Sequence, residues 1–192
     1  MTPQRIRHPN LLSADRTLLV VVDMQETFLK PVWERKRVCT NVVLLMRAVQ
    51  ILGVPVITTA QYTERMGGPI PEVTALLPEG IQPLDKLCFS CAGETEFISK
   101  VKNSGRNQLL LCGIETHICV CQTALDMLSA GFKVHAAADA VSSRTESAWK
   151  LGLKKMAQSG VVIGSTEGAI YELMNQAGTP EFREVLKLIK DS

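Results

Sequence analysis

The 192-residue sequence lacks the features that mark several large classes of protein. No apolar run reaches the roughly 20 residues of a membrane-spanning helix, and the N-terminus has no apolar signal-peptide core, so neither a membrane protein nor a secreted one is expected. The 21 Lys and Arg residues nearly balance the 19 Asp and Glu residues without a dense basic stripe, which argues against a nucleic-acid partner. A GxGxxG motif and a P-loop are both missing, so nucleotide binding has no local support.

Histidine is also scarce, which limits the ways in which a cysteine could be activated. His8 precedes the predicted fold, and His135 falls within a predicted strand. His117 lies two positions before Cys119, and at that spacing on a helix its side chain would point away from the thiol. A Cys–His dyad is therefore the weaker mechanism for this chain.

The chain has six cysteines but no secretory signal, which predicts reduced thiols and a cytoplasmic location. Cys88 and Cys91 form a CxxC motif, which could be a redox pair or half of a zinc site. A second pair with suitable spacing is missing, because Cys119 and Cys121 are separated by a single residue. Metal binding and thiol redox chemistry are therefore the less favoured interpretations.

The length and the hydrophobic fraction of 46% fit one globular domain over residues 1–192. Apolar, β-branched runs alternate with segments of helical periodicity, and a Gly- and Pro-rich stretch over 61–83 is typical of a loop or lid. Strands are predicted over 17–22, 54–59, 84–89, 108–112, 133–138 and 161–163. Helices are predicted over 37–52, 94–103, 117–130, 145–159, 167–175 and 180–190. Repeated strand–helix units indicate a doubly wound, Rossmann-like α/β fold with a largely parallel sheet.

Three polar or reactive side chains fall where the predicted strands end. Asp23 ends the first strand, Lys86 lies in or beside the short third one, and Cys119 follows the fourth by one turn. In open parallel sheets the functional residues gather beyond the carboxyl ends of the strands. We therefore expect these three residues to converge on one crevice.

Each of the three has a structural alternative. Asp23 could cap the following turn, Lys86 could be a solvated lysine paired with an acid, and Cys119 could be a core thiol. Taken together they favour nucleophilic catalysis, in which the carboxylate takes the thiol proton and the lysine keeps the carboxylate ionised. The start of a helix at Cys119 predicts a lowered thiol pKa, and amides of the 115–119 turn could bind an oxyanion.

The segments that carry these residues resemble the isochorismatase-like cysteine hydrolases. The resemblance rests on the Asp-Met-Gln triplet at 23–25, the lysine of the third strand, and the sequence GIETHICV at 113–120. It covers nearly the whole chain in order and spacing. The sequences CFS at 88–90, QTALD at 122–126 and DAVSSR at 139–144 are most similar to the isochorismatase domain-containing subgroup.

This resemblance implies a three-layer α/β/α fold with a six-stranded, mostly parallel sheet and a Cys–Asp–Lys triad of Cys119, Asp23 and Lys86. It also implies a cis peptide between Ile114 and Glu115, backbone amides of Glu115 and Cys119 as the oxyanion hole, and a homo-oligomer. Metal-dependent nicotinamidases of the superfamily carry an Asp and histidines after the second strand. The corresponding residues 58–63 read TTAQYT, so no metal is expected and no cofactor is required.

We therefore expect a hydrolase of a small amide or related acyl compound that acts through a thioester. The retained Cys119 favours acyl chemistry over the vinyl-ether hydrolysis of true isochorismatases. Non-catalytic binding or a scaffold role is the alternative from another class, followed by a thiol redox protein using the CxxC motif. The predicted contacts to a small-molecule substrate are Gln25, Phe28, Trp33 and Tyr62.

Overall fold

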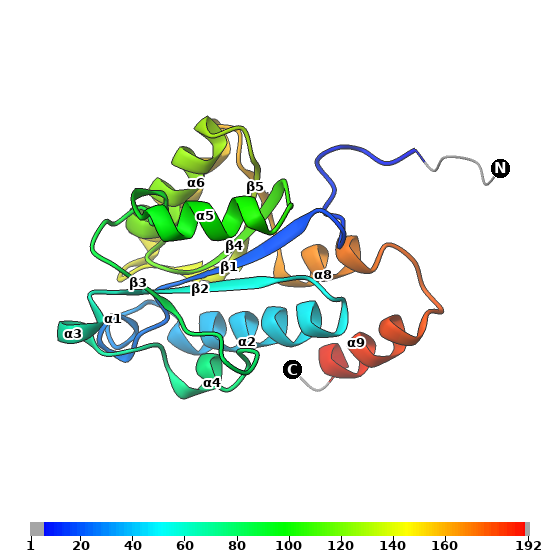
Figure 1. Ribbon diagram of the computed structural model, residues 1–192, viewed down its shortest axis with the longest axis horizontal. Coiled ribbons are helices and arrows are strands. Elements are labelled where there is room, and N and C mark those ends of the chain that lie inside the picture. Colours follow the sequence, from blue (N-terminus) through cyan, green and yellow to red (C-terminus); the bar gives the residue numbers. More distant parts are fainter. Residues whose placement is uncertain (1–5, 191–192) are drawn as a thin grey trace.

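The computed structural model describes residues 6–190, so the two ends of the predicted 1–192 domain lie outside the described residues. It shows a six-stranded, all-parallel sheet between two layers of helices (Figure 1). The strand order is β3-β2-β1-β4-β5-β6. The strands are β1 (Thr17–Val22), β2 (Val56–Gln61), β3 (Leu84–Lys86), β4 (Gln108–Ile114), β5 (Lys133–Ser142) and β6 (Val162–Gly164). The predicted α/β class and the six-stranded sheet are confirmed.

The helices divide between the two faces of the sheet, with α2, α4, α8 and α9 on one face and α5, α6 and α7 on the other (Figure 1). No helix within residues 6–190 has the length and apolar character needed to cross a membrane. The longer helices are α2 (Arg35–Ile51), α5 (Thr95–Asn103), α6 (Cys121–Ser129), α7 (Glu146–Gln158), α8 (Thr166–Met174) and α9 (Pro180–Lys190). The short ones are α1 (Glu26–Leu29), α3 (Thr63–Met66), α4 (Pro71–Thr74), the 3-10 helix η1 (Cys91–Gly93) and the π-helix η2 (Thr116–Val120).

The central strand β1 shows why the sequence forms a sheet that is buried on both faces. Leu19 and Val21 belong to one hydrophobic core, whereas Leu18, Val20 and Val22 belong to the other. Side chains alternate between the two faces of a strand, so a continuous apolar run supplies both cores at once. The polar residue that follows this run, Asp23, is thereby placed at the carboxyl edge of the sheet.

Besides shifts of several residues at strand ends, two parts of the chain form elements that were not predicted. The 61–83 stretch contains α3 and α4, and α1 follows β1 closely; each of these helices has four residues, too few to show helical periodicity. The helix predicted over 117–130 begins as the π-helix η2 and continues as α6. Such π-turns are rare and frequently occur at functional sites.

The buried histidine of β5 gives the fold a pH-dependent stability. Burial, with a smaller contribution from the charge of Lys133, lowers the pKa of His135 to about 4, and within residues 6–190 no group hydrogen-bonds its Nε2. The unfolded chain, with a histidine pKa of about 6.5, therefore binds more protons than the folded chain between these two values. The stability conferred by the neutral imidazole is present above pH ~6.5 and is lost as the pH falls toward 4.

We expect His135→Leu to weaken this acid dependence by about 1.4 kcal/mol per pH unit within that window. Urea unfolding at pH 7 and at pH 4.5 measures the effect. His8→Gln, a change at an exposed histidine, is the control, and its unfolding free energy should depend on pH as that of the wild type does. An unchanged slope in His135→Leu would contradict the assignment.

Candidate active site

The three predicted site residues meet at the carboxyl edge of the sheet. Asp23 directly follows β1, Lys86 is the last residue of β3, and Cys119 lies in η2. The Nζ atom of Lys86 is 2.7 Å from Oδ2 of Asp23, and both side chains are buried. The Cys119 thiol is near enough to this carboxylate for the charge of Asp23 to act on it, and both residues line one pocket. Asp23 is therefore a neighbour of both the ammonium group and the thiol.

The Asp23 carboxylate is held in place by its neighbours on β2. Thr59 donates its hydroxyl to Oδ1 of Asp23 at 2.8 Å, and the Asp23 amide donates to the Thr59 carbonyl at 3.2 Å. The carboxylate makes no capping bond to α1, whose N-cap is Gln25. Its contacts with Lys86, Thr59 and the thiol thus replace the capping alternative.

The pKa of the Cys119 thiol is shifted in the direction opposite to the predicted one. Burial, followed by the negative charge of Asp23, raises the pKa of Cys119 to about 12, although Lys86 opposes this shift. Burial is the largest single influence on Lys86 and would lower its pKa, but the Asp23 carboxylate together with Cys119 and Cys91 outweighs it, so the net shift is upward. The predicted lowering of the Cys119 pKa is therefore wrong, because burial and a neighbouring carboxylate dominate over the helix start. At neutral pH the Cys119 thiol of the resting site is therefore protonated.

Gln61, the last residue of β2, is a site residue that the sequence analysis missed. Its Oε1 accepts from Lys86 Nζ at 2.6 Å, and its Nε2 donates to the Leu87 carbonyl at 2.8 Å. The same Nζ lies 3.2 Å from each of the Cys88 and Phe89 carbonyl oxygens. The rule that functional residues follow strand ends would have included Gln61 if β2 had been predicted two residues further along.

A pocket of ≈ 70 Å³ opens beside the thiol. Half of its walls are apolar and half are polar, and they come from four of the six strand ends and the segments that follow them. The lining residues are Asp23, Phe28, Gln61, Phe89, Ile114, Glu115, Ile118 and Cys119. Phe28 is therefore a pocket wall, as predicted, and Phe89 and Ile118 are walls that the sequence analysis did not name.

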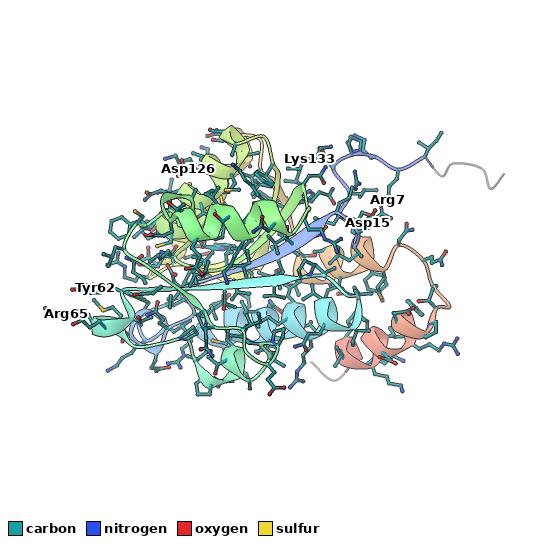
Figure 2. All side chains as sticks on the ribbon, in the orientation of Figure 1. Arg7, Asp15, Tyr62, Arg65, Asp126 and Lys133 are labelled. Carbon is teal, nitrogen blue, oxygen red and sulfur yellow. The ribbon has the colours of Figure 1, made fainter. Side chains whose placement is uncertain are left out.

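Three of the predicted substrate contacts do not line this pocket. Gln25 is fully buried, and its side-chain amide donates to the carbonyl of Gln61, the last residue of β2. Trp33 packs on Trp149, with the two ring centroids 5.1 Å apart. Tyr62 precedes α3, and Figure 2 shows it with Arg65 at the outer end of the molecule. These orientations follow from tertiary packing. A residue that is close to a predicted site residue in sequence need not point its side chain into the pocket.

The turn that leads from β4 into η2 supplies one wall of the pocket. The Ile114–Glu115 peptide bond is cis. Oε2 of Glu115 accepts from the Arg144 amide at 3.0 Å and from Arg144 Nε at 3.1 Å, which links the turn to the segment after β5. Glu115 and Cys119 therefore face the same pocket from the two ends of one short turn.

The remaining cysteines and histidines do not join this group. All six cysteines are free, and burial raises the pKa of Cys91 to about 11, whereas Cys88 is exposed. His117 contacts Ser143 Oγ through Nδ1 at 2.9 Å and does not line the pocket. Among residues 6–190, no group of three or more His, Cys, Asp or Glu side chains is arranged to hold a metal ion.

Comparison with known proteins identifies the family. A model of the isochorismatase domain matches residues 17–168, a range that includes Asp23, Lys86 and Cys119. The chain belongs to the isochorismatase family. This membership supports a hydrolase function for the protein.

Relatives of this isochorismatase-family protein match it over most of their own length. The secreted isochorismatase effector Isc1 of Phytophthora sojae is 39% identical, over 91% of this chain and 85% of that protein. Isochorismatase domain-containing protein 2 of Danio rerio is 38% identical, over 93% and 89% respectively. A solved structure titled MAR1 ribonuclease from Caenorhabditis elegans superposes with a TM-score of 0.88 at 33% identity, covering 93% of this chain and 92% of that one. The predicted resemblance to the isochorismatase domain-containing subgroup is confirmed.

Proposed function

We propose that this protein is a metal-independent cysteine hydrolase of a small amide or related acyl compound. One observation carries the proposal: the Asp23 carboxylate contacts the Lys86 ammonium at 2.7 Å and lines the same pocket as the Cys119 thiol, on which its charge acts. A nucleophile, a base within reach of its proton and a group that orients the base are the requirements of covalent acyl transfer. Residues 58–63 lack the histidines of the metal-dependent relatives, which favours the metal-independent form.

The first half of the reaction forms a thioester. Asp23 removes the proton from Cys119 as Sγ attacks the substrate carbonyl, and the carbonyl π electrons move to the oxygen. The backbone amides of Glu115 and Cys119 stabilise this oxyanion. The tetrahedral intermediate then collapses, the C–N bond breaks, and the departing amine takes the proton held by Asp23.

The second half regenerates the enzyme. Asp23 removes a proton from water, and the resulting hydroxide adds to the thioester carbonyl. Collapse breaks the C–S bond, releases the carboxylic acid and returns the proton to Cys119. Lys86 holds Asp23 in position throughout and favours its ionised form before each proton transfer, and Gln61 holds Lys86.

A panel of small amides, esters and thioesters tests this proposal, with RNA included because the Caenorhabditis elegans relative is titled a ribonuclease. We expect turnover of an acyl compound, and after acid quenching an acyl adduct that peptide mapping places on Cys119. Turnover of RNA alone, or acyl turnover that persists after complete alkylation of Cys119, would contradict the proposal. A panel without turnover, together with a stable protein partner, would favour the binding or scaffold alternative.

We also propose that the protein forms a homo-oligomer in a reducing compartment such as the cytosol. YcaC of Escherichia coli, a structural neighbour at 22% identity and a TM-score of 0.83, is titled an octameric hydrolase. All six thiols of the present chain are free, which suits a reducing compartment. Light scattering that gives a monomer mass at every concentration would contradict the assembly.

A further inference from the structure

The pocket beside Cys119 presents no cationic side chain to a bound molecule. Its eight lining residues include two carboxylates, Asp23 and Glu115, but no arginine, lysine or histidine. Four of the remaining walls are the apolar side chains of Phe28, Phe89, Ile114 and Ile118.

Each of the two lining carboxylates is paired with a cation that lies outside the lining. Lys86 is buried behind the pocket wall, where its Nζ contacts Asp23, Gln61 and the carbonyl groups of Cys88 and Phe89. An ammonium group has three protons to donate, so these four contacts leave none for a ligand. Arg144 lies outside the lining, with its Nε committed to Glu115.

An anionic ligand would therefore enter a site whose lining holds two carboxylates and no cationic side chain. Burial removes the water that stabilises an anion, and like charges at close range add repulsion. A neutral acyl compound meets neither cost, and its apolar part can contact the phenylalanine and isoleucine side chains.

We infer that this pocket selects small, uncharged acyl substrates and rejects those that carry a carboxylate near the reacting carbon. The inference rests on the proposed function, because it assumes that Cys119 is the nucleophile. It narrows the substrate class from any small amide or ester to neutral ones with a compact apolar acyl group.

A pair of alkylating reagents of nearly equal size tests the inference. Iodoacetamide is neutral and iodoacetate is anionic, and with each the thiol loses its proton, a C–S bond forms and iodide leaves. The second-order rate constants at Cys119 are measured on the folded protein by quantitative peptide mass spectrometry. The exposed Cys88 of the same chain and free N-acetylcysteine are the references.

We expect the iodoacetamide-to-iodoacetate rate ratio at Cys119 to exceed the ratio at both references by tenfold or more. Equal ratios with a reactive Cys119 would overturn the inference and leave the proposed function in place. If Cys119 reacts with both reagents no faster than the buried Cys112, the proposed nucleophile is wrong, and the inference fails with it.

A change of one wall residue provides an independent check. Phe89 lines the pocket and its side chain is partly solvent-exposed, so lysine at this position can be accommodated without disrupting a core. We expect Phe89→Lys to lower the rate ratio at Cys119 at least fivefold by supplying the missing cation, whereas the matched neutral variant Phe89→Gln should not. If both variants change the ratio equally, wall charge does not control selection and the inference is overturned.

Discussion

Replacing Asp23 with asparagine is expected to lower the turnover of an acyl substrate by about 10²–10⁴-fold, the usual contribution of a positioned general base. Asparagine has nearly the shape of aspartate but cannot take a proton from the Cys119 thiol. The effect should be large because the pKa of this thiol is raised to about 12, so few molecules hold the thiolate without help from the carboxylate.

The measurement is kcat/KM for the best substrate of the panel, and the Cys119→Ala variant gives the background rate of the assay. Asp126→Asn is the matched control, since Asp126 is exposed on α6 and should tolerate the same change without effect. Turnover of Asp23→Asn within a factor of three of wild type would exclude Asp23 as the base.

The stability of the Asp23 variants must be measured alongside their activity. Asp23→Asn leaves the buried ammonium of Lys86 without its anionic partner, and breaking a buried ion pair typically costs about 3–5 kcal/mol. Asp23→Glu keeps the negative charge but moves the carboxylate by one methylene group. We expect Asp23→Glu to fold more stably than Asp23→Asn yet remain well below wild type in turnover.

Most of the sheet could be predicted from the sequence because its signals are local. The apolar run of β1 predicted that Asp23 would lie at the carboxyl edge of the sheet, and the alternation of strand and helix patterns placed Lys86 and Cys119 at the same edge. Gln61 was missed because the end of β2 was predicted at residue 59, whereas β2 ends at Gln61 itself. Because the predicted end of β2 is two residues too early, Gln61, whose side chain accepts a hydrogen bond from Lys86, was not included among the strand-end residues.

Properties that depend on the packed environment could not be predicted in this way. The position of Cys119 near a helix start indicated a lowered thiol pKa, but the actual shift depends on burial and on the distance to Asp23. Trp33 is near the site in sequence, yet it packs on Trp149 from α7, a contact between distant segments. Side-chain direction and desolvation are tertiary properties, which local patterns do not contain.

Gly113→Ala is expected to destabilise the protein by about 4 kcal/mol or more, in the range reserved for exceptional substitutions. Gly113 adopts a φ of +105°, and a Cβ atom added there would lie 2.1 Å from the Val22 carbonyl oxygen. That oxygen belongs to the backbone of β1, which is paired along its whole length with β4, so it cannot move away as a flexible side chain could. The clash falls between Val22, which precedes Asp23, and Gly113, which precedes Ile114 and Glu115, so it affects two walls of the pocket together.

Urea unfolding of Gly113→Ala and of Gly105→Ala separates two causes of this destabilisation, the backbone strain of a positive φ and the steric clash with Val22. Gly105 has a φ of +67° but no atom within 4 Å of an added Cβ, so its alanine variant carries the backbone strain alone, about 1–2 kcal/mol. The excess in Gly113→Ala measures the close approach of β1 and β4. Equal losses in the two variants would mean that these strands can separate without cost, and the close approach would then not be what fixes Asp23 against the turn that carries Cys119.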